Sequence, residues 1–137
     1  MTERVHPIVA RMMEADAMSQ WLGIEVLESG PGKCRCRMKV REEMVNGFGI
    51  AHGAITYALA DSTLAFAVNA GGRHAVSVNS TIQHLTPVMV GDVIESRAIP
   101  RSEGQRIVHV DVEITNQKGE LVAWLTATGY KRSTSWS

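Results

Sequence analysis

The feature that most constrains this chain is the segment 46–72, which reads NGFGIAHGAITYALADSTLAFAVNAGG. Its apolar run predicts one long helix over residues 52–70, and the pair Gly71-Gly72 suits a left-handed stop at the end of that helix. Because apolar residues occupy the whole circumference, the helix is predicted to be buried rather than to lie on a surface. We expect a sheet to wrap one side of it, and the simplest cover for the other side is a second copy of the chain.

The flanking sequence predicts a further helix before this segment and an antiparallel sheet around it. The apolar spacing of residues 7–20 favours a helix, and alternation favours a hairpin over residues 24–40 with Cys34 and Cys36 pointing inward. Four more strands are predicted after the long helix, at residues 73–85, 93–101, 105–115 and 120–132. Residues 133–137 are predicted to be a loose tail. Helices segregated to one face of an antiparallel sheet define an α+β fold.

The bulk properties are those of one globular domain spanning residues 1–137, with a helical segment at 1–22 and a tail at 132–137. A formal net charge of +0 gives no reason to expect nucleic acid or an anionic membrane as partner. We see no secretory signal and no membrane span, so a cytoplasmic location is expected. Cys34 and Cys36 are one residue apart and are predicted to stay reduced. No metal-ligand spacing is found.

Two residues of the long helix carry the chemical argument. A helix start has unpaired backbone N–H groups that bind anions and developing oxyanions, and Gly53 would let a carbonyl reach them. A tight loop explains that glycine equally well. Asp61 lies among apolar residues, where burial raises the pKa of a carboxyl group towards the range of a catalytic base. The alternative is a structural acid that bonds a nearby hydroxyl or backbone group.

The spacing between these two residues constrains how they act. Asp61 follows Gly53 by eight residues, which is roughly 12 Å along a helix axis. Reacting groups must approach within about 3 Å of their target. One carbonyl therefore cannot easily contact both groups in a single chain. If both act together, Gly53 comes from one chain and Asp61 from its partner.

The segment NGFGIAHGAITYALADS resembles the hotdog-fold acyl-CoA thioesterases of the phenylacetate-degradation (PaaI-like) type. That family has an Asn, then His-Gly-Gly six residues later, then an Asp nine residues beyond the His; here these are Asn46, His52-Gly53 and Asp61. The resemblance implies a sheet curled around the central helix, dimers joined edge to edge, usually tetramers, and sites at the dimer interface. The second glycine of the pattern is Ala54 here, which puts the size or orientation of the acyl group in question.

The resemblance also implies roles for individual residues. Asp61 would be the general base or nucleophile, and the Gly53 N–H would polarise the thioester carbonyl. Asn46 would orient the carbonyl or the attacking water. His52 would fix the loop at the helix start, and Ser77 would place a hydroxyl near the water.

Other side chains suggest weaker hypotheses. Near strand ends, arginines that could hold the phosphates of coenzyme A are Arg73, Arg101 and Arg106. The outward basic residues of the hairpin (Arg35, Arg37, Lys39 and Arg41) form either an anion site or, more simply, a solvated strand face. The methionines Met12, Met13 and Met18 either line an acyl pocket or, more simply, pack against the core.

Taken together, the residues and the resemblance predict a homodimeric or homotetrameric acyl-CoA thioesterase. Its expected substrate is an aryl- or medium-chain acyl-CoA, and no cofactor is expected because coenzyme A is part of the substrate. Two alternatives stay open. One is a hotdog acyl-CoA hydratase or dehydratase, and the other is a non-catalytic acyl-CoA-binding sensor or accessory protein.

Overall fold

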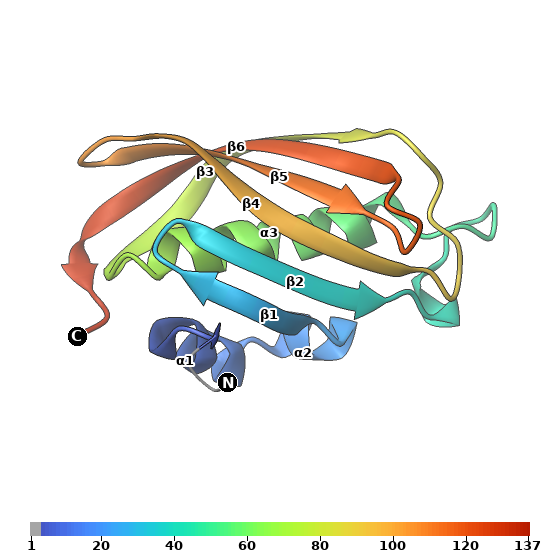
Figure 1. The fold of residues 1–137 in the computed structure, drawn as a ribbon, viewed down its shortest axis with the longest axis horizontal. Helices are drawn as coiled ribbons and strands as arrows, with labels where there is room; N and C mark the ends of the chain where they lie inside the picture. Colours follow the sequence, from blue (N-terminus) through green and yellow to red (C-terminus); the bar gives the residue numbers. More distant parts are fainter. Residues whose placement is uncertain (1–3) are drawn as a thin grey trace.

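The computed structural model of the protein describes residues 4–137. In chain order the elements are α1 (Pro7–Ala15), α2 (Ala17–Leu22), β1 (Glu25–Gly30), β2 (Lys33–Lys39), a short 3-10 helix (Glu42–Met44), α3 (Gly53–Asn69), β3 (Arg73–His84), β4 (Val93–Glu103), β5 (Ile107–Thr115) and β6 (Leu121–Ser135). The strands form one antiparallel sheet in the order β1-β2-β4-β5-β6-β3 (Figure 1). The predicted α+β class, the long helix and each of the six strands are confirmed.

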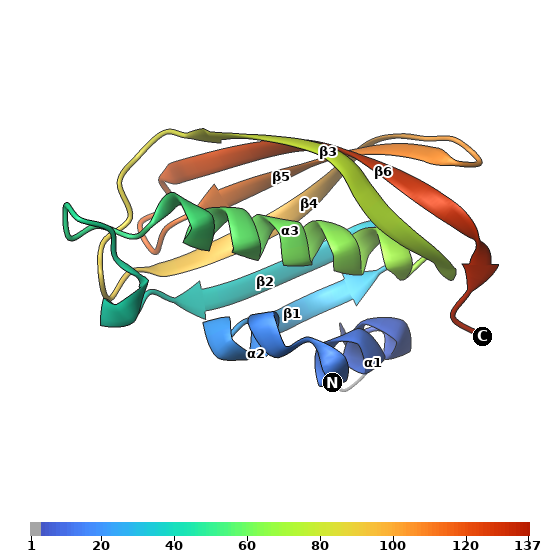
Figure 2. The same cartoon turned by 180° about the vertical axis from the view of Figure 1, so that it is seen from behind.

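The sheet curves around α3, which runs along its inner face (Figure 2). Along α3, Leu59 and Phe66 are fully buried against the inward side chains of the strands. On β2 those inward side chains are Cys34, Cys36 and Met38, as the alternation predicts, and the two cysteines are free thiols. The opposite stripe of α3, which includes Tyr57, Ala58, Ala65 and Val68, is exposed or half-buried although its residues are mostly apolar, so within residues 4–137 the helix is covered mainly on the sheet side.

The single N-terminal helix that the spacing predicts is instead two helices. The chain breaks at Asp16, whose backbone is not helical and whose carboxylate caps α2 by accepting the amide of Ser19 at 2.9 Å. The break changes which side chains face inward. Ser19 is buried, whereas Trp21 in the second helix is 48% exposed. The prediction of one helix is wrong because Asp16 is more favourable as the N-cap of α2 than as an interior residue of a continuous helix.

The prediction of a loose tail is wrong. Strand β6 continues to Ser135, which pairs with Arg73 at the start of β3. Trp136 then donates its backbone amide to the carbonyl of Gly72 at 2.9 Å and its indole N–H to Asn69 Oδ1 at 3.0 Å. The Ser- and Thr-rich sequence looks like coil, but it is ordered by pairing with a strand some sixty positions earlier, which local patterns do not report.

Strand β3 forms one edge of the sheet. It pairs with β6 on one side, and on the other side its backbone has no strand partner within residues 4–137. Its side chains Val76 and Val78 are 52% and 60% exposed. A long, open and partly apolar edge is a template for pairing with another strand.

Candidate active site

The start of α3 presents one backbone donor. His52 caps the helix: its Nδ1 accepts the amide of Ala54 at 3.0 Å, and its carbonyl accepts the amide of Ile55 at 2.9 Å. The amide of Gly53 makes no hydrogen bond to any residue in 4–137. Two of the first helical N–H groups are therefore used, and that of Gly53 is left for a ligand.

The glycine at this position provides space. The backbone of Gly53 has no positive φ, so its conformation does not require glycine. A Cβ built there would lie 3.2 Å from Nε2 of His84, closer than side chains normally approach. The backbone conformation of a tight loop therefore does not explain the glycine at position 53. A steric reason does, because His84 fills the volume that a side chain at this position would need.

Gly53 opens into a cavity of about 350 Å³, which we term the Gly53 pocket. Asn46 lies in its wall, and its Oδ1 accepts the amide of Phe48 at 2.9 Å and so shapes the loop before α3. The Nδ2 of Asn46 donates to no residue in the part of the chain that the structure describes. The pocket therefore contains two uncharged N–H donors with no acceptor among the described residues, the backbone N–H of Gly53 and the Nδ2 of Asn46.

Asp61 lies in a different cavity, of about 250 Å³, which we term the Asp61 pocket. Ser77 of β3 is in the same wall, together with the apolar side chains of Leu64 and Val68. The Asp61 carboxylate accepts no hydrogen bond and forms no ion pair with any of residues 4–137. This result argues against the structural-acid interpretation, because a structural carboxylate is expected to have a partner.

The surroundings of Asp61 raise the pKa of its carboxyl group. Burial is the larger cause, and the negative charge of Asp16 at the start of α2 is the second. Asp16 is held there by a directed chain of hydroxyls, in which Ser62 donates to Ser19 and Ser19 donates to Asp16, each over 2.7 Å. The N-terminal helices thus bring a second acid towards the Asp61 pocket.

The structure groups the predicted site residues into two sets. Asn46 and Gly53 share one pocket, with His52 as the cap beside them, and Asp61 and Ser77 share the other. The two pockets have no lining residue in common. Within one chain, therefore, the Gly53 N–H and the Asp61 carboxylate do not meet.

The three arginines suggested as phosphate ligands line neither pocket. Arg73 donates to the carbonyls of Gln105, Lys131 and Arg132, which ties the start of β3 to β6 and to the turn between β4 and β5. Arg101 pairs with the buried Asp111 at 3.1 Å, and Arg106 donates to the Tyr130 hydroxyl at 3.3 Å. Each of these guanidinium groups already has a partner inside the chain.

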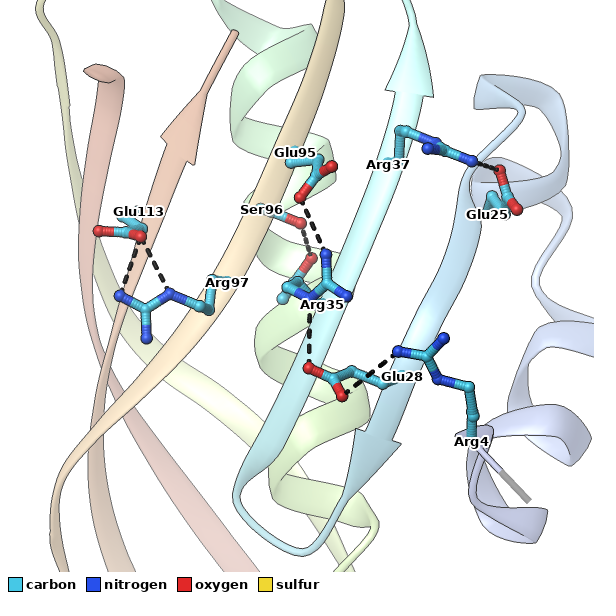
Figure 3. Close-up of polar contacts among 10 residues, drawn as sticks. Arg4, Glu25, Glu28, Arg35, Arg37, Glu95, Ser96, Arg97 and Glu113 are labelled. Atoms are coloured by element: carbon cyan, nitrogen blue, oxygen red, sulfur yellow. Dashed lines mark hydrogen bonds and ion pairs between the residues drawn. The ribbon is translucent and has the colours of Figure 1, made fainter. Parts of the chain in front are cut away.

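Two of the outward basic residues of β2, Arg35 and Arg37, are also paired, as Figure 3 shows. Arg35 lies between Glu28 and Glu95, at 3.1 Å from each, and Arg37 reaches Glu25 at 2.9 Å. These arginines face carboxylates of the adjacent strands, so the anion-site interpretation of this row is not supported. Of the three methionines suggested for an acyl pocket, Met12 and Met13 pack against the core, and Met18 is exposed.

His84 is the residue that sequence reasoning missed. It is the last residue of β3, and its ring lines the Gly53 pocket next to Gly53 itself. Its Nδ1 lies 3.3 Å from the hydroxyl of Thr56, one turn into α3. In the sequence it is one of four histidines outside the His52-Gly53 pattern, and no local signal marks it.

No helix formed by residues 4–137 is long and apolar enough to cross a membrane. The same residues contain no cluster of three or more His, Cys, Asp or Glu side chains arranged to hold a metal ion.

The sheet curled around α3, with a free N–H at the helix start and an acid in its middle, is the architecture of the hotdog fold. Residues 48–123 match the thioesterase superfamily. The chain is 36% identical over 112 residues to acyl-coenzyme A thioesterase PaaI of Escherichia coli, covering 82% of this chain and 80% of that one. The solved structure of the E. coli PaaI protein from the phenylacetic acid degradation operon superposes with a TM-score of 0.90 and 32% identity, covering 92% of this chain and 91% of that one.

Two further relatives agree. Acyl-coenzyme A thioesterase 13 of Homo sapiens is 33% identical over 127 residues, covering 90% of this chain and 91% of that one. A hypothetical thioesterase of Streptococcus pneumoniae, solved with coenzyme A, has a TM-score of 0.85 and 26% identity, covering 91% of this chain and 98% of that one. The chain belongs to the thioesterase superfamily, and it is a thioester hydrolase. That membership sets aside the alternative of a non-catalytic binding protein.

The raised pKa of Asp61 predicts a pH-dependent effect of Asp61→Asn on stability. Because the folded chain holds this pKa above its ordinary value, the ionised carboxylate disfavours folding, and this penalty appears as pH rises through the folded-state pKa. Asp61→Asn should therefore melt at a higher temperature than wild type at neutral pH. The difference should shrink as the pH falls towards the ordinary pKa of an aspartate, below which the carboxyl group is protonated in both states.

Thermal unfolding at fixed protein concentration, from about pH 7 down to pH 4, measures this difference. A lower melting temperature for Asp61→Asn at neutral pH would mean that the carboxylate stabilises the fold through a partner.

Proposed function

We propose that the protein hydrolyses an aryl- or medium-chain acyl-CoA to the free acid and coenzyme A, at a site built from two chains. The observation that carries the proposal is a pair of groups on α3 with no partner among residues 4–137, the Gly53 N–H and the Asp61 carboxylate, each in its own pocket. Thioester hydrolysis needs both a donor for the developing oxyanion and a base or nucleophile. A partner helix that runs past α3 would bring the two together.

The open edge of β3 supports a partner in this position. Ser77 and His84 are both on β3, and this strand carries side chains of both pockets. Pairing of two β3 edges would place each Asp61 pocket against the other chain and would cover Val76 and Val78. The homodimer is therefore part of the proposal, and a homotetramer formed from two such dimers is its extension.

In the proposed reaction the carbonyl oxygen of the thioester accepts the N–H of Gly53 from one chain. Asn46 of the same chain donates its free Nδ2 to the carbonyl or to the attacking water. Asp61 of the other chain removes a proton from that water or attacks the carbonyl itself, and the Ser77 hydroxyl beside it orients the water. His52 keeps the helix start in place by capping it. The reaction uses no cofactor.

The nature of the acyl group is inferred from the pocket and the relatives. Beyond Asp61, the Asp61 pocket is lined mainly by Leu64, Ala65, Val68 and Val76, which suits an apolar acyl group. One relative comes from a phenylacetic acid degradation operon, and another was solved with coenzyme A. Ala54, which replaces the family glycine, is exposed and lies outside the lining of the Gly53 pocket. Free thiols at Cys34 and Cys36 fit the proposed cytoplasmic location.

The N–H of Gly53 can be tested by a matched pair of variants. Gly53→Pro removes the N–H at a first helical position, where proline is tolerated, and His52 already has the extended backbone that precedes proline. Gly53→Ala adds a similar Cβ near His84 but keeps the N–H. The proline variant should lose about 10²–10³-fold in kcat, and the alanine variant far less. Asp61→Asn should lose about 10²-fold or more.

Thiol release from phenylacetyl-CoA and from short-, medium- and long-chain acyl-CoAs measures these rates. Circular dichroism of each variant checks that the fold is intact. If folded Asp61→Asn hydrolyses its best substrate at the wild-type rate, the proposed mechanism is wrong.

Complementation tests whether the site spans two chains. Asp61→Asn and Gly53→Pro, each inactive alone, should regain activity when they are unfolded, mixed and refolded together. A mixed dimer contains one site with both Gly53 and Asp61 intact, so an equimolar mixture should regain about a quarter of wild-type activity. A site formed within a single chain would give no recovery, because every chain carries one defect.

Hydration of an unsaturated acyl-CoA is a second candidate reaction. Family dehydratases usually pair an acid with a catalytic histidine, and the structure adds His84 to the Gly53 pocket. Incubation with crotonyl-CoA separates the two reactions, since hydration removes the conjugated double bond without releasing thiol. We expect thiol release without hydration; loss of the conjugated absorbance at unchanged thiol concentration would favour the hydratase.

A further inference from the structure

The Gly53 pocket contains one titratable side chain among its lining residues, that of His84. The other lining residues are apolar or neutral, and the polar side chains among them are those of Asn46, Thr56 and Thr86. Hydrolysis of a thioester requires two proton transfers, one from the attacking water and one to the departing thiolate. Asp61 accounts for the first, and the proposed function assigns no group to the second.

Hydrogen bonding orients the imidazole. The Thr56 hydroxyl donates its single proton to the carbonyl of Gly53 at 3.1 Å. It can therefore only accept from His84, which assigns a proton to Nδ1 across the 3.3 Å contact. Thr56 is buried, with 3% of its surface exposed, so this anchor is shielded from water. The second ring nitrogen, Nε2, is then free to exchange a proton with a ligand.

Nε2 lies beside the carbonyl-binding N–H. It is the atom nearest to the Cβ position of Gly53, at 3.2 Å, with Cε1 at 3.4 Å. A thioester whose carbonyl oxygen accepts the Gly53 N–H has its sulfur two covalent bonds from that oxygen. The sulfur consequently stays close to the Gly53 N–H, and His84 is the titratable side chain in the pocket lining beside that group.

We propose that His84 is the general acid that protonates the departing thiolate of coenzyme A. This inference rests on the proposed function. Water adds to the carbonyl carbon as Asp61 of the partner chain takes its proton, and the oxygen of the tetrahedral intermediate is held by the Gly53 N–H. The C–S bond then breaks, and the Nε2–H of protonated His84 passes its proton to sulfur. Asp61 returns its proton to solvent and His84 takes one up, so the sum is thioester plus water to acid plus thiol.

The leaving group distinguishes this role from others. A proton assists the departure of a thiolate of ordinary basicity, whose thiol is the dominant form near neutral pH. The thiolate of 4-nitrothiophenol is a much weaker base and departs unprotonated. Loss of the general acid should therefore slow hydrolysis of the coenzyme A ester and leave hydrolysis of the 4-nitrothiophenyl ester nearly unchanged.

The experiment compares His84→Gln with wild type on two thioesters of the same acyl group, one of coenzyme A and one of 4-nitrothiophenol. His84→Gln should lose about 100-fold in kcat on the CoA ester and keep close to the wild-type rate on the nitrothiophenyl ester. His109→Gln is the matched control, since His109 is exposed on β5 and bonds only Ser102 among the described residues. It should hydrolyse both substrates at the wild-type rate.

Equal losses of His84→Gln on both substrates, or no loss on either, would overturn the assignment. Asp61→Asn distinguishes the two proposals, because water must be activated whatever the leaving group. Its rate should fall on both thioesters. A wild-type rate of Asp61→Asn on both would overturn the proposed function, whereas the His84 comparison alone decides the general acid.

Discussion

Burial of α3 against the concave face of the sheet is the constraint on which the other features of the protein depend. The side of this helix that packs on the sheet must be apolar, and Asp61 is half-buried among apolar neighbours, so its carboxylate is poorly solvated and its pKa is raised. The same enclosure leaves the helix start as a separate opening, where His52 takes up one N–H and leaves that of Gly53. Reactive groups are thus present on one helix, but in two pockets.

Strand β3 serves both pockets because it runs back along α3. Ser77 is near the middle of the helix, next to Asp61, and His84 is near its start, next to Gly53. Seven positions separate Ser77 from His84, which in a regular strand would place them on opposite faces. A register shift between Ser77 and Asn79 changes this parity, so both side chains line pockets beside α3. The irregularity in β3 therefore allows one strand to contribute a side chain to each of the two pockets.

Several charged side chains on the outer face of the sheet are paired, whereas the Asp61 carboxylate near the inner face is not paired with any described residue. On the outer face arginines and glutamates of adjacent strands neutralise one another, as Arg97 and Glu113 do at 2.9 Å. Such exposed pairs contribute little stability individually. Near the inner face the Asp61 carboxyl has no such partner among the described residues, and Asp16 adds a second negative charge to its surroundings. An acid kept without a counterion is costly for folding and useful for proton transfer.

The sequence by itself determined the elements and the reactive residues of α3. Period-two and helical patterns carry that information locally, so the six strands, the inward Cys34 and Cys36, and the separation of Gly53 from Asp61 all followed from residue order. Local patterns did not show the break at Asp16, the pairing that orders the chain up to Trp136, or the place of His84. Those features depend on strand pairing and on contacts between residues far apart in sequence. The tertiary structure alone brought His84, thirty-one positions after Gly53, to the side of that glycine.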